Sequence, residues 1–120
     1  MKILIVDDDP IARLIIRQNL SHVSVSNPQI QDAVNGKEAL DVIAEKKVDV
    51  VLLDLNMPIM NGFDVLNALK EQASDIPVYV ITSSNLVENR MKCEAFSMVK
   101  GFFEKPITHG ALDVLSAYDH

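Results

Sequence analysis

Three short apolar runs constrain the fold of this chain more than any other feature. ILIV (residues 3–6), DVVLLD (49–54) and VYVIT (78–82) are rich in β-branched residues, and their apolar residues are continuous instead of alternating with polar ones. Strands that are buried on both faces of a parallel sheet have this pattern. We therefore predict a parallel sheet with helices packed against both of its faces.

Segments with the apolar spacing of a helix follow these runs. The predicted helices cover residues 10–20, 36–46, 63–72 and 85–99, and a weaker pattern covers 109–118. Two further strands are predicted at QIQDAV (29–34) and GFFEK (101–105). A strand is thus followed by a helix five times, which predicts a three-layer α/β fold with the flavodoxin-like strand order 2-1-3-4-5.

Composition and charge restrict the class of protein. With 120 residues, of which 48% are apolar, the whole chain (1–120) is expected to form one domain. The net charge of −6 argues against nucleic acid or an anionic membrane as the main partner, and it makes a cation the more natural ligand. The single cysteine, Cys93, permits neither a disulfide framework nor a cysteine-rich zinc site. Since the chain has neither a signal-peptide pattern nor an apolar run of spanning length, we expect a cytoplasmic protein.

The first strand ends in three aspartates, Asp7, Asp8 and Asp9. Asp9 precedes Pro10, and an aspartate in this position is a normal cap for a helix that begins with proline. Helix capping does not also explain Asp7 and Asp8. Two carboxylates about 4 Å apart repel by roughly 4 kcal/mol at an effective dielectric constant of about 20. This pair therefore either extends into water or binds a metal ion.

The third strand also ends in an aspartate, Asp54. Because the carboxyl ends of parallel strands share one edge of the sheet, the predicted strand order brings Asp54 next to Asp7 and Asp8. Carboxylate oxygens, backbone carbonyls and water are the ligands that Mg²⁺ prefers, and a divalent ion relieves the repulsion between the carboxylates. The sequence therefore predicts a Mg²⁺ site at this edge.

Two other strands end in polar residues at the same edge. Thr82 is the last residue of the fourth strand and can offer its hydroxyl to the site, whereas Ser84 or Asn85 is the expected cap of the next helix. Lys105 ends the fifth strand and is followed by Pro106, which fixes the backbone there. The charges of the carboxylates, Mg²⁺ and Lys105 cancel, so an arriving phosphoryl group would meet no net repulsion.

These motifs resemble the receiver domain of two-component response regulators, of the stand-alone chemotaxis-regulator kind. The matching segments cover essentially the whole chain and stand in the order and spacing of the family. They are ILIVDDD, NGKEAL, VVLLDLNMPIMNGFDVL, VYVITSS and GFFEKPIT. Each motif alone is weak evidence, but together they are highly specific.

The resemblance implies a phosphoacceptor and a metal site among the acidic residues. Asp54 would accept a phosphoryl group. Asp8 and Asp54 would bind Mg²⁺ directly, as would the backbone carbonyl of Asn56. Asp7 would bind the ion through water.

The same resemblance assigns Thr82 and Lys105 to the phosphoryl group. Thr82 would donate a hydrogen bond to it, and Lys105 would neutralise its oxygens. The peptide bond between Lys105 and Pro106 would be cis, which proline tolerates far better than other residues. The chain would then be no enzyme but a phosphoacceptor that assists its own phosphorylation and dephosphorylation. Its donor would be a sensor histidine kinase or a phosphotransfer protein.

The expected signalling face departs from the family pattern. Position 102, commonly an aromatic switch with a tyrosine hydroxyl, is Phe102, and Met98 and Val99 replace the small residues usual before the last strand. The last predicted helix is short, and we expect no output domain after it. We expect a downstream protein to bind the face formed by residues 85–99, 101–105 and 109–118. Phe102 would act there as a switch by shape alone.

Three alternative functions make different demands on the sequence. A haloacid-dehalogenase-like phosphatase needs an acid two residues after its nucleophile, where this chain has Asn56. A flavin-binding protein of the same fold needs a phosphate loop rich in Ser, Thr and Gly where this chain has three aspartates. A receiver-like binding module that is never phosphorylated typically lacks acidic-site residues that are present here. His22, His109 and His120 are isolated in sequence and are assigned no role.

Overall fold

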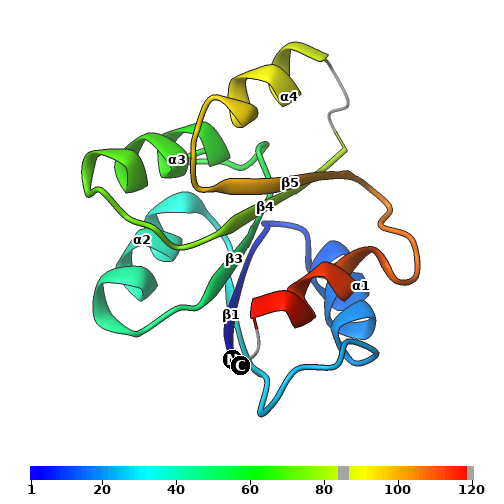
Figure 1. Cartoon of the computed structure of the whole chain (residues 1–120). Helices are drawn as coiled ribbons and strands as arrows, with labels where there is room; N and C mark the ends of the chain where they lie inside the picture. The colour runs from blue at the N-terminus through cyan, green and yellow to red at the C-terminus, as the bar shows by residue number, and fades with distance from the viewer. Residues whose placement is uncertain (84–86, 119–120) are drawn as a thin grey trace.

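A parallel sheet of five strands forms the centre of the protein (Figure 1). The structure, a computed structural model, describes residues 1–83 and 87–118. The strands are β1 (Lys2–Val6), β2 (Gln29–Ala33), β3 (Val50–Leu53), β4 (Val78–Thr82) and β5 (Val99–Glu104). Their order across the sheet is β2-β1-β3-β4-β5, which confirms the predicted flavodoxin-like order.

Helices cover both faces of this sheet. They are α1 (Pro10–Leu20), α2 (Gly36–Glu45), α3 (Gly62–Glu71), α4 (Val87–Glu94) and the 3₁₀ helix η1 (Ala111–Tyr118). Figure 1 shows α1 and η1 together on one face, and α2 and α3 on the other. The predicted three-layer α/β architecture is therefore confirmed.

Successive residues of the strands contribute to two separate hydrophobic cores. Leu4 and Val6 of β1 pack into the core beneath α2, α3 and α4, which we call the α2–α4 core. Ile3 and Ile5 pack into the opposite core with α1 and η1, which we call the α1–η1 core. Because both faces of the central strands are buried, their apolar runs are continuous in the sequence.

Side-chain caps fix where three of the helices begin. The Asp9 carboxylate accepts a hydrogen bond from the Ile11 N–H at 3.0 Å, which confirms its predicted role as the cap of α1. Asn35 caps α2 in the same way. Asn61 caps α3, and the Asp64 side chain bonds back to the Asn61 N–H to complete a capping box. These caps end the loops that leave the carboxyl edge of the sheet.

The predicted helix 85–99 is wrong at its C-terminal end, because α4 ends at Glu94. The side chains of Phe96 and Met98 both pack in the α2–α4 core. Residues two positions apart do not lie on the same face of an α-helix, so the chain leaves the helix before them. The expected cap at Ser84 or Asn85 lies outside the described residues.

The last predicted helix is present but is of the 3₁₀ type. The Asp113 N–H donates to the Gly110 carbonyl at 3.1 Å, which is the i→i+3 pattern of this helix. Leu112 and Leu115, three residues apart, both reach the α1–η1 core. A helix with three residues per turn places such a pair on one face, and the weak α-helical pattern of the sequence reflects this spacing. Within the described residues, no helix is long and apolar enough to cross a membrane.

Candidate functional site

Three carboxylates meet at the carboxyl edge of the sheet. Asp7, Asp8 and Asp54 each offer one oxygen, and these oxygens all lie within 4.8 Å of one another. The strand pairing continues past the ends of the strands, since the Asp7 N–H donates to the Ala33 carbonyl and the Asp54 N–H to the Val6 carbonyl. Asp7 and Asp54 are only 1% and 5% exposed, whereas Asp8 is exposed to solvent. The predicted convergence of these three residues is therefore present.

Asp7 is the most extensively bonded of the three. One carboxylate oxygen accepts the Asp9 N–H at 2.9 Å, and the other accepts the Lys105 ammonium at 2.5 Å. The Asp7 carbonyl also accepts a hydrogen bond from the Arg13 guanidinium at 2.7 Å. These contacts hold the carboxylate of Asp7 in one orientation at the end of β1.

Lys105 reaches this cluster from the far side of the site. Its ammonium nitrogen lies 3.4 Å from an oxygen of Asp54 as well as in contact with Asp7. The Lys105 N–H donates to the Thr82 carbonyl at 2.8 Å, and the Lys105–Pro106 peptide bond is cis, as expected from the resemblance. A single ammonium group thus contacts two of the three carboxylates.

Burial and charge shift the pKa values of this pair. Burial raises the pKa of the Asp7 carboxyl, and the hydrogen bonds from Lys105 and the Asp9 N–H offset only part of that effect. Burial alone would lower the pKa of Lys105, but its hydrogen bond to Asp7 and the charges of Asp54 and Asp7 outweigh burial, so the net pKa is raised. Lys105 therefore stays protonated at neutral pH, beside more negative charge than it can neutralise.

The donor set of this cluster fits a hard divalent cation. The carboxylate oxygens lie close together, and Asp8 is exposed to solvent. This arrangement suits Mg²⁺, because the bound ion retains several water ligands. Asn56 follows the cluster in the loop after β3, and its N–H lies 3.4 Å from a carboxylate oxygen of Asp54. The Asn56 carbonyl remains a predicted direct ligand, together with Asp8 and Asp54.

The two other predicted residues lie on β4 and β5. Thr82 is fully buried at the carboxyl end of β4, at the edge where the sequence predicts it. Phe102 is partly buried against the α2–α4 core, with the guanidinium carbon of Arg90 above its ring at 5.9 Å from the ring centre. The Phe102 side chain therefore connects β5 with α4 by packing against Arg90.

Two residues with clear structural effects on the site were not identified from the sequence. Arg13 anchors the backbone of Asp7, and its position one turn into α1 could have suggested this contact. Gly62 lies so close to the loop after β3 that a Cβ there would be 2.5 Å from the carbonyl oxygen of Asp54. The Asn61-Gly62 pair indicates a turn in the sequence but not this close approach.

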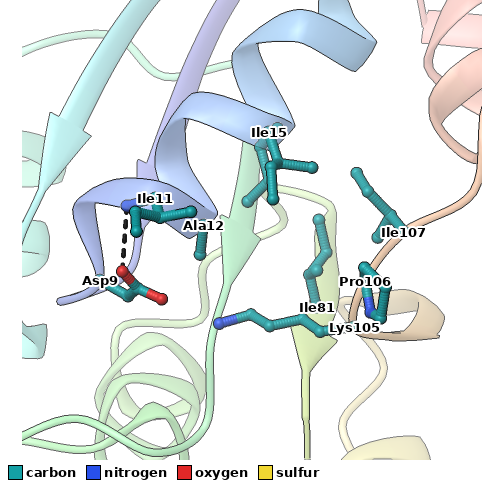
Figure 2. Close-up of a pocket in the computed structure, with 9 residues that line it drawn as sticks. Asp9, Ile11, Ala12, Ile15, Ile81, Lys105, Pro106 and Ile107 are labelled. Carbon is teal, nitrogen blue, oxygen red and sulfur yellow. Dashed lines mark hydrogen bonds between the residues drawn. The ribbon is translucent and has the colours of Figure 1, made fainter.

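A largely apolar cavity of about 250 Å³ adjoins Lys105. Figure 2 shows Ile11 and Ile15 of α1 on one side of it, and Pro106 and Ile107 on the other. The Lys105 side chain extends past the cavity toward the start of α1. Apolar surface therefore lies directly beside the charged cluster.

The sequence profile of the response regulator receiver domain matches residues 3–115. The chain belongs to this family. Receiver domains of two-component systems are phosphoacceptors and generally not enzymes.

Curated relatives include both kinases and regulators. The sensor histidine kinase RcsC of Salmonella typhimurium is 34% identical over 115 residues, which are 96% of this chain and 11% of that protein. The response regulator MprA of Mycolicibacterium vanbaalenii is 38% identical over 91 residues, which are 76% of this chain and 38% of that protein. The chain therefore spans only a small part of the length of these relatives.

Solved structures agree with the family assignment. The receiver domain of the Francisella response regulator 1452 has a TM-score of 0.81 at 26% identity, and the match covers 98% of this chain and 94% of that chain. The chemotaxis response regulator CheY4 of Vibrio cholerae has a TM-score of 0.80 at 27% identity, over 98% of this chain and 97% of that chain. Receiver folds of this kind are thus matched over nearly their full length.

Proposed function

We propose that residues 1–120 form one receiver domain that accepts a phosphoryl group on Asp54 during two-component signal transduction. The observation that carries this proposal is the position of Lys105, whose ammonium contacts Asp7 and lies 3.4 Å from Asp54. A phosphoryl group on Asp54 would bring its oxygens within reach of the same ammonium. Lys105 can therefore stabilise charge that develops during transfer to Asp54.

Phosphoryl transfer to Asp54 requires little covalent machinery beyond its carboxylate. A carboxylate oxygen of Asp54 attacks the phosphorus in line, the bond from phosphorus to the histidine nitrogen of the donor breaks, and an acyl phosphate forms. Lys105 donates hydrogen bonds to the transferred oxygens, and the Thr82 hydroxyl donates another. Hydrolysis of the acyl phosphate by water returns the carboxylate, so the domain assists both its phosphorylation and its dephosphorylation.

Mg²⁺ is the cofactor that we propose for this reaction. Asp8, Asp54 and the Asn56 carbonyl would hold the ion directly, and Asp7 would hold it through water. Among the described residues, Lys105 is the only ammonium beside the three carboxylates, so it leaves part of their negative charge unbalanced. When bound, Mg²⁺ supplies the missing positive charge. The close approach of the three carboxylates in the described structure supports this assignment.

The partners that we propose are a phosphodonor and a downstream protein. Relatives named as sensor histidine kinases and as response regulators support a histidine kinase or a phosphotransfer protein as the donor. The downstream protein would bind the face formed by α4, β5 and η1. Val87 and Met91 of α4 are 72% and 65% exposed, which gives this face apolar surface to bury. We place the domain in the cytoplasm, where histidine kinases obtain phosphoryl groups from ATP.

A phosphorylation assay tests the assignment of Asp54. The untagged domain is incubated with Mg²⁺ and acetyl phosphate or phosphoramidate, and its intact mass is measured. One phosphoryl group should be gained, and it should be stable in acid and labile in base. Asp54→Asn should gain none, whereas Asp41→Asn, which removes the same charge from the exposed side of α2, should be labelled like the wild type.

Two outcomes would decide against the proposal. Equal labelling of Asp54→Asn would mean that another residue is the acceptor. A wild-type domain that is never labelled, with either phosphodonor and saturating Mg²⁺, would favour the alternative of a receiver-like module that binds partners without phosphorylation. The phosphatase alternative has less support, because Asn56 cannot protonate a leaving group as an acid would.

A further inference from the structure

Two histidines that are distant in the sequence lie side by side in the structure. His22 follows the end of α1, and His109 lies in the segment between β5 and η1. Their ring centres are 5.2 Å apart and their planes are inclined at 66°. The isolation of these histidines in the sequence gave no indication of this pair.

The separation of the two rings suits one shared metal ion. Two imidazoles bound to a tetrahedral Zn²⁺, each with a Zn–N bond of about 2.0–2.1 Å, have ring centres roughly 5 Å apart. Inclined ring planes are compatible with such coordination, because each nitrogen lone pair lies in the plane of its own ring. The separation and inclination of the rings are therefore compatible with one shared ion.

A third possible ligand lies in the same place. The side-chain oxygen Oδ1 of Asn19 is buried and has no hydrogen-bond partner among the described residues. The other end of this amide is occupied, since its nitrogen donates to the Ile15 carbonyl at 3.1 Å. A buried carbonyl oxygen without a partner costs free energy, and a cation would remove that cost.

These groups surround a common space. A cavity of about 210 Å³ is lined by Gln18, Asn19, His22 and His109. His22 and His109 are both exposed to solvent at this cavity, whereas the Asn19 oxygen is closed to solvent and must turn toward the rings to bind an ion with them. Imidazole ligands favour Zn²⁺, Cu²⁺ or Ni²⁺ over Mg²⁺, which prefers oxygen ligands.

We propose that His22, His109 and the Oδ1 of Asn19 bind one divalent transition-metal ion, with Zn²⁺ as the ion to test. Water completes the coordination. The site is separate from the acidic cluster: Asn19 stands ten residues after Asp9 on α1, which is about 15 Å along a helix that rises 1.5 Å per residue. The bound ion joins the end of α1 to the segment that leads from Lys105 into η1. The proposal does not depend on phosphorylation of Asp54.

Calorimetric titration with Zn²⁺ alone tests the site. The untagged domain is titrated in excess Mg²⁺, so that oxygen-ligand sites are already occupied. His22→Gln and His109→Gln should each lower the Zn²⁺ affinity by about tenfold or more, since even residues behind the ligands contribute about 10–100-fold. Asp8→Asn should bind Zn²⁺ like the wild type. Unchanged affinity in both histidine variants, or a loss confined to Asp8→Asn, would overturn the proposal.

Two further measurements identify the ligands. Zn²⁺ should shift the ring nitrogen resonances of His22 and His109 in a ¹⁵N spectrum of the histidine side chains. Asn19→Asp should bind Zn²⁺ more tightly than the wild type, because a carboxylate replaces the neutral oxygen. Unshifted rings at millimolar Zn²⁺ would rule out imidazole binding, and an Asn19→Asp affinity no higher than that of the wild type would rule out the third ligand. Thermal melts of each variant without metal confirm that it is folded.

Discussion

The ammonium of Lys105 and the carboxylate of Asp7 form an ion pair across the carboxyl edge of the sheet. β3 and β4 lie between the strands that these residues follow, so the pair spans the ends of four adjacent strands. Neighbouring strands are about 4.8 Å apart, so the long side chain of lysine contributes to this span but does not cover it alone. The Asp54 carboxylate lies beneath this span, 3.4 Å from the same nitrogen.

Removing one carboxylate from the cluster should stabilise the domain without metal and weaken its binding of Mg²⁺. In Asp8→Asn, the repulsion on Asp7 and Asp54 is reduced, so the melting temperature without metal should rise. The variant also lacks a direct ligand, so its Mg²⁺ affinity should fall by at least about tenfold. Thermal melts in chelator and a Mg²⁺ titration measure the two effects. Asp41→Asn is the control for charge alone, and a variant that melts lower and binds Mg²⁺ normally would contradict the argument.

The pKa of Asp7 predicts how stability without metal depends on pH. Because burial raises the pKa of Asp7 above its usual 3.8, the folded protein holds this proton more tightly than the unfolded chain. The stabilisation from this group is fully present below the usual pKa and is lost as the pH rises through the raised one.

The comparison of the wild type with Asp7→Asn isolates this effect. The difference in the free energy of unfolding, wild type minus variant, should decrease as the pH rises from about 4 toward neutrality. Urea unfolding in chelator at several pH values measures it. Lys105 remains charged over this range because its pKa is raised, so it does not contribute to the trend. A difference that grows with pH would show that the ion pair with Lys105 outweighs burial.

Much of the fold was predictable because local and tertiary preferences agree. The continuous apolar runs around Leu4, Leu52 and Val80 are strands that are buried on both faces. Their apolar pattern therefore predicts a parallel sheet that is covered on both sides. The acidic cluster followed from the strand order alone, because Asp7, Asp8 and Asp54 stand where strands end.

Other features depend on contacts that no local pattern encodes. Helix α4 ends before Phe96 because the ring of Phe96 packs into the α2–α4 core. The periodicity of apolar residues in the sequence does not predict this tertiary contact. The pairing of His22 with His109 needs η1 to pack beside α1, and neither segment alone indicates it. The close approach of Gly62 to Asp54 likewise arises only in the folded chain.

Gly62→Ala should destabilise the domain, although helix propensity alone predicts the opposite. Alanine is about 1 kcal/mol more favourable than glycine inside a helix. A Cβ at this position, however, would lie 2.5 Å from the Asp54 carbonyl oxygen and 2.8 Å from the Leu55 Cα, so backbone must move. Overpacking of this kind costs about 1–3 kcal/mol. Urea unfolding should therefore give a lower stability, whereas the exposed Asn67→Ala in α3 should be neutral or stabilising; a gain in Gly62→Ala would refute the close approach.

Phe102→Ala should separate phosphoryl chemistry from signalling. Without a hydroxyl, Phe102 can couple only through the shape of its ring, which fills space between β5 and the Arg90 side chain of α4. The variant should still bind Mg²⁺ and beryllofluoride, a phosphoryl mimic, but should lose most of the amide shift changes that the mimic causes between residues 85 and 117.

Phe103→Ala is the matched control for this experiment. Its ring lies in the other core, stacked on Tyr79 at 6.1 Å between ring centres. The control should retain the shift changes in α4 even if it is less stable. Undiminished changes in Phe102→Ala, measured by NMR under the same conditions, would mean that this ring is core packing and no switch.

The division of the interior by the sheet has a consequence for how this sequence can change over evolution. Volume lost at Leu66 in the α2–α4 core cannot be recovered by a larger side chain near Ile16 in the α1–η1 core, because the strands lie between them. Substitutions on opposite faces should therefore add in their effects, while those within one face are coupled. The residues on one face of the sheet can therefore change to fit a new partner while those on the other face stay the same. Compensating substitutions should be sought on the same side of the sheet.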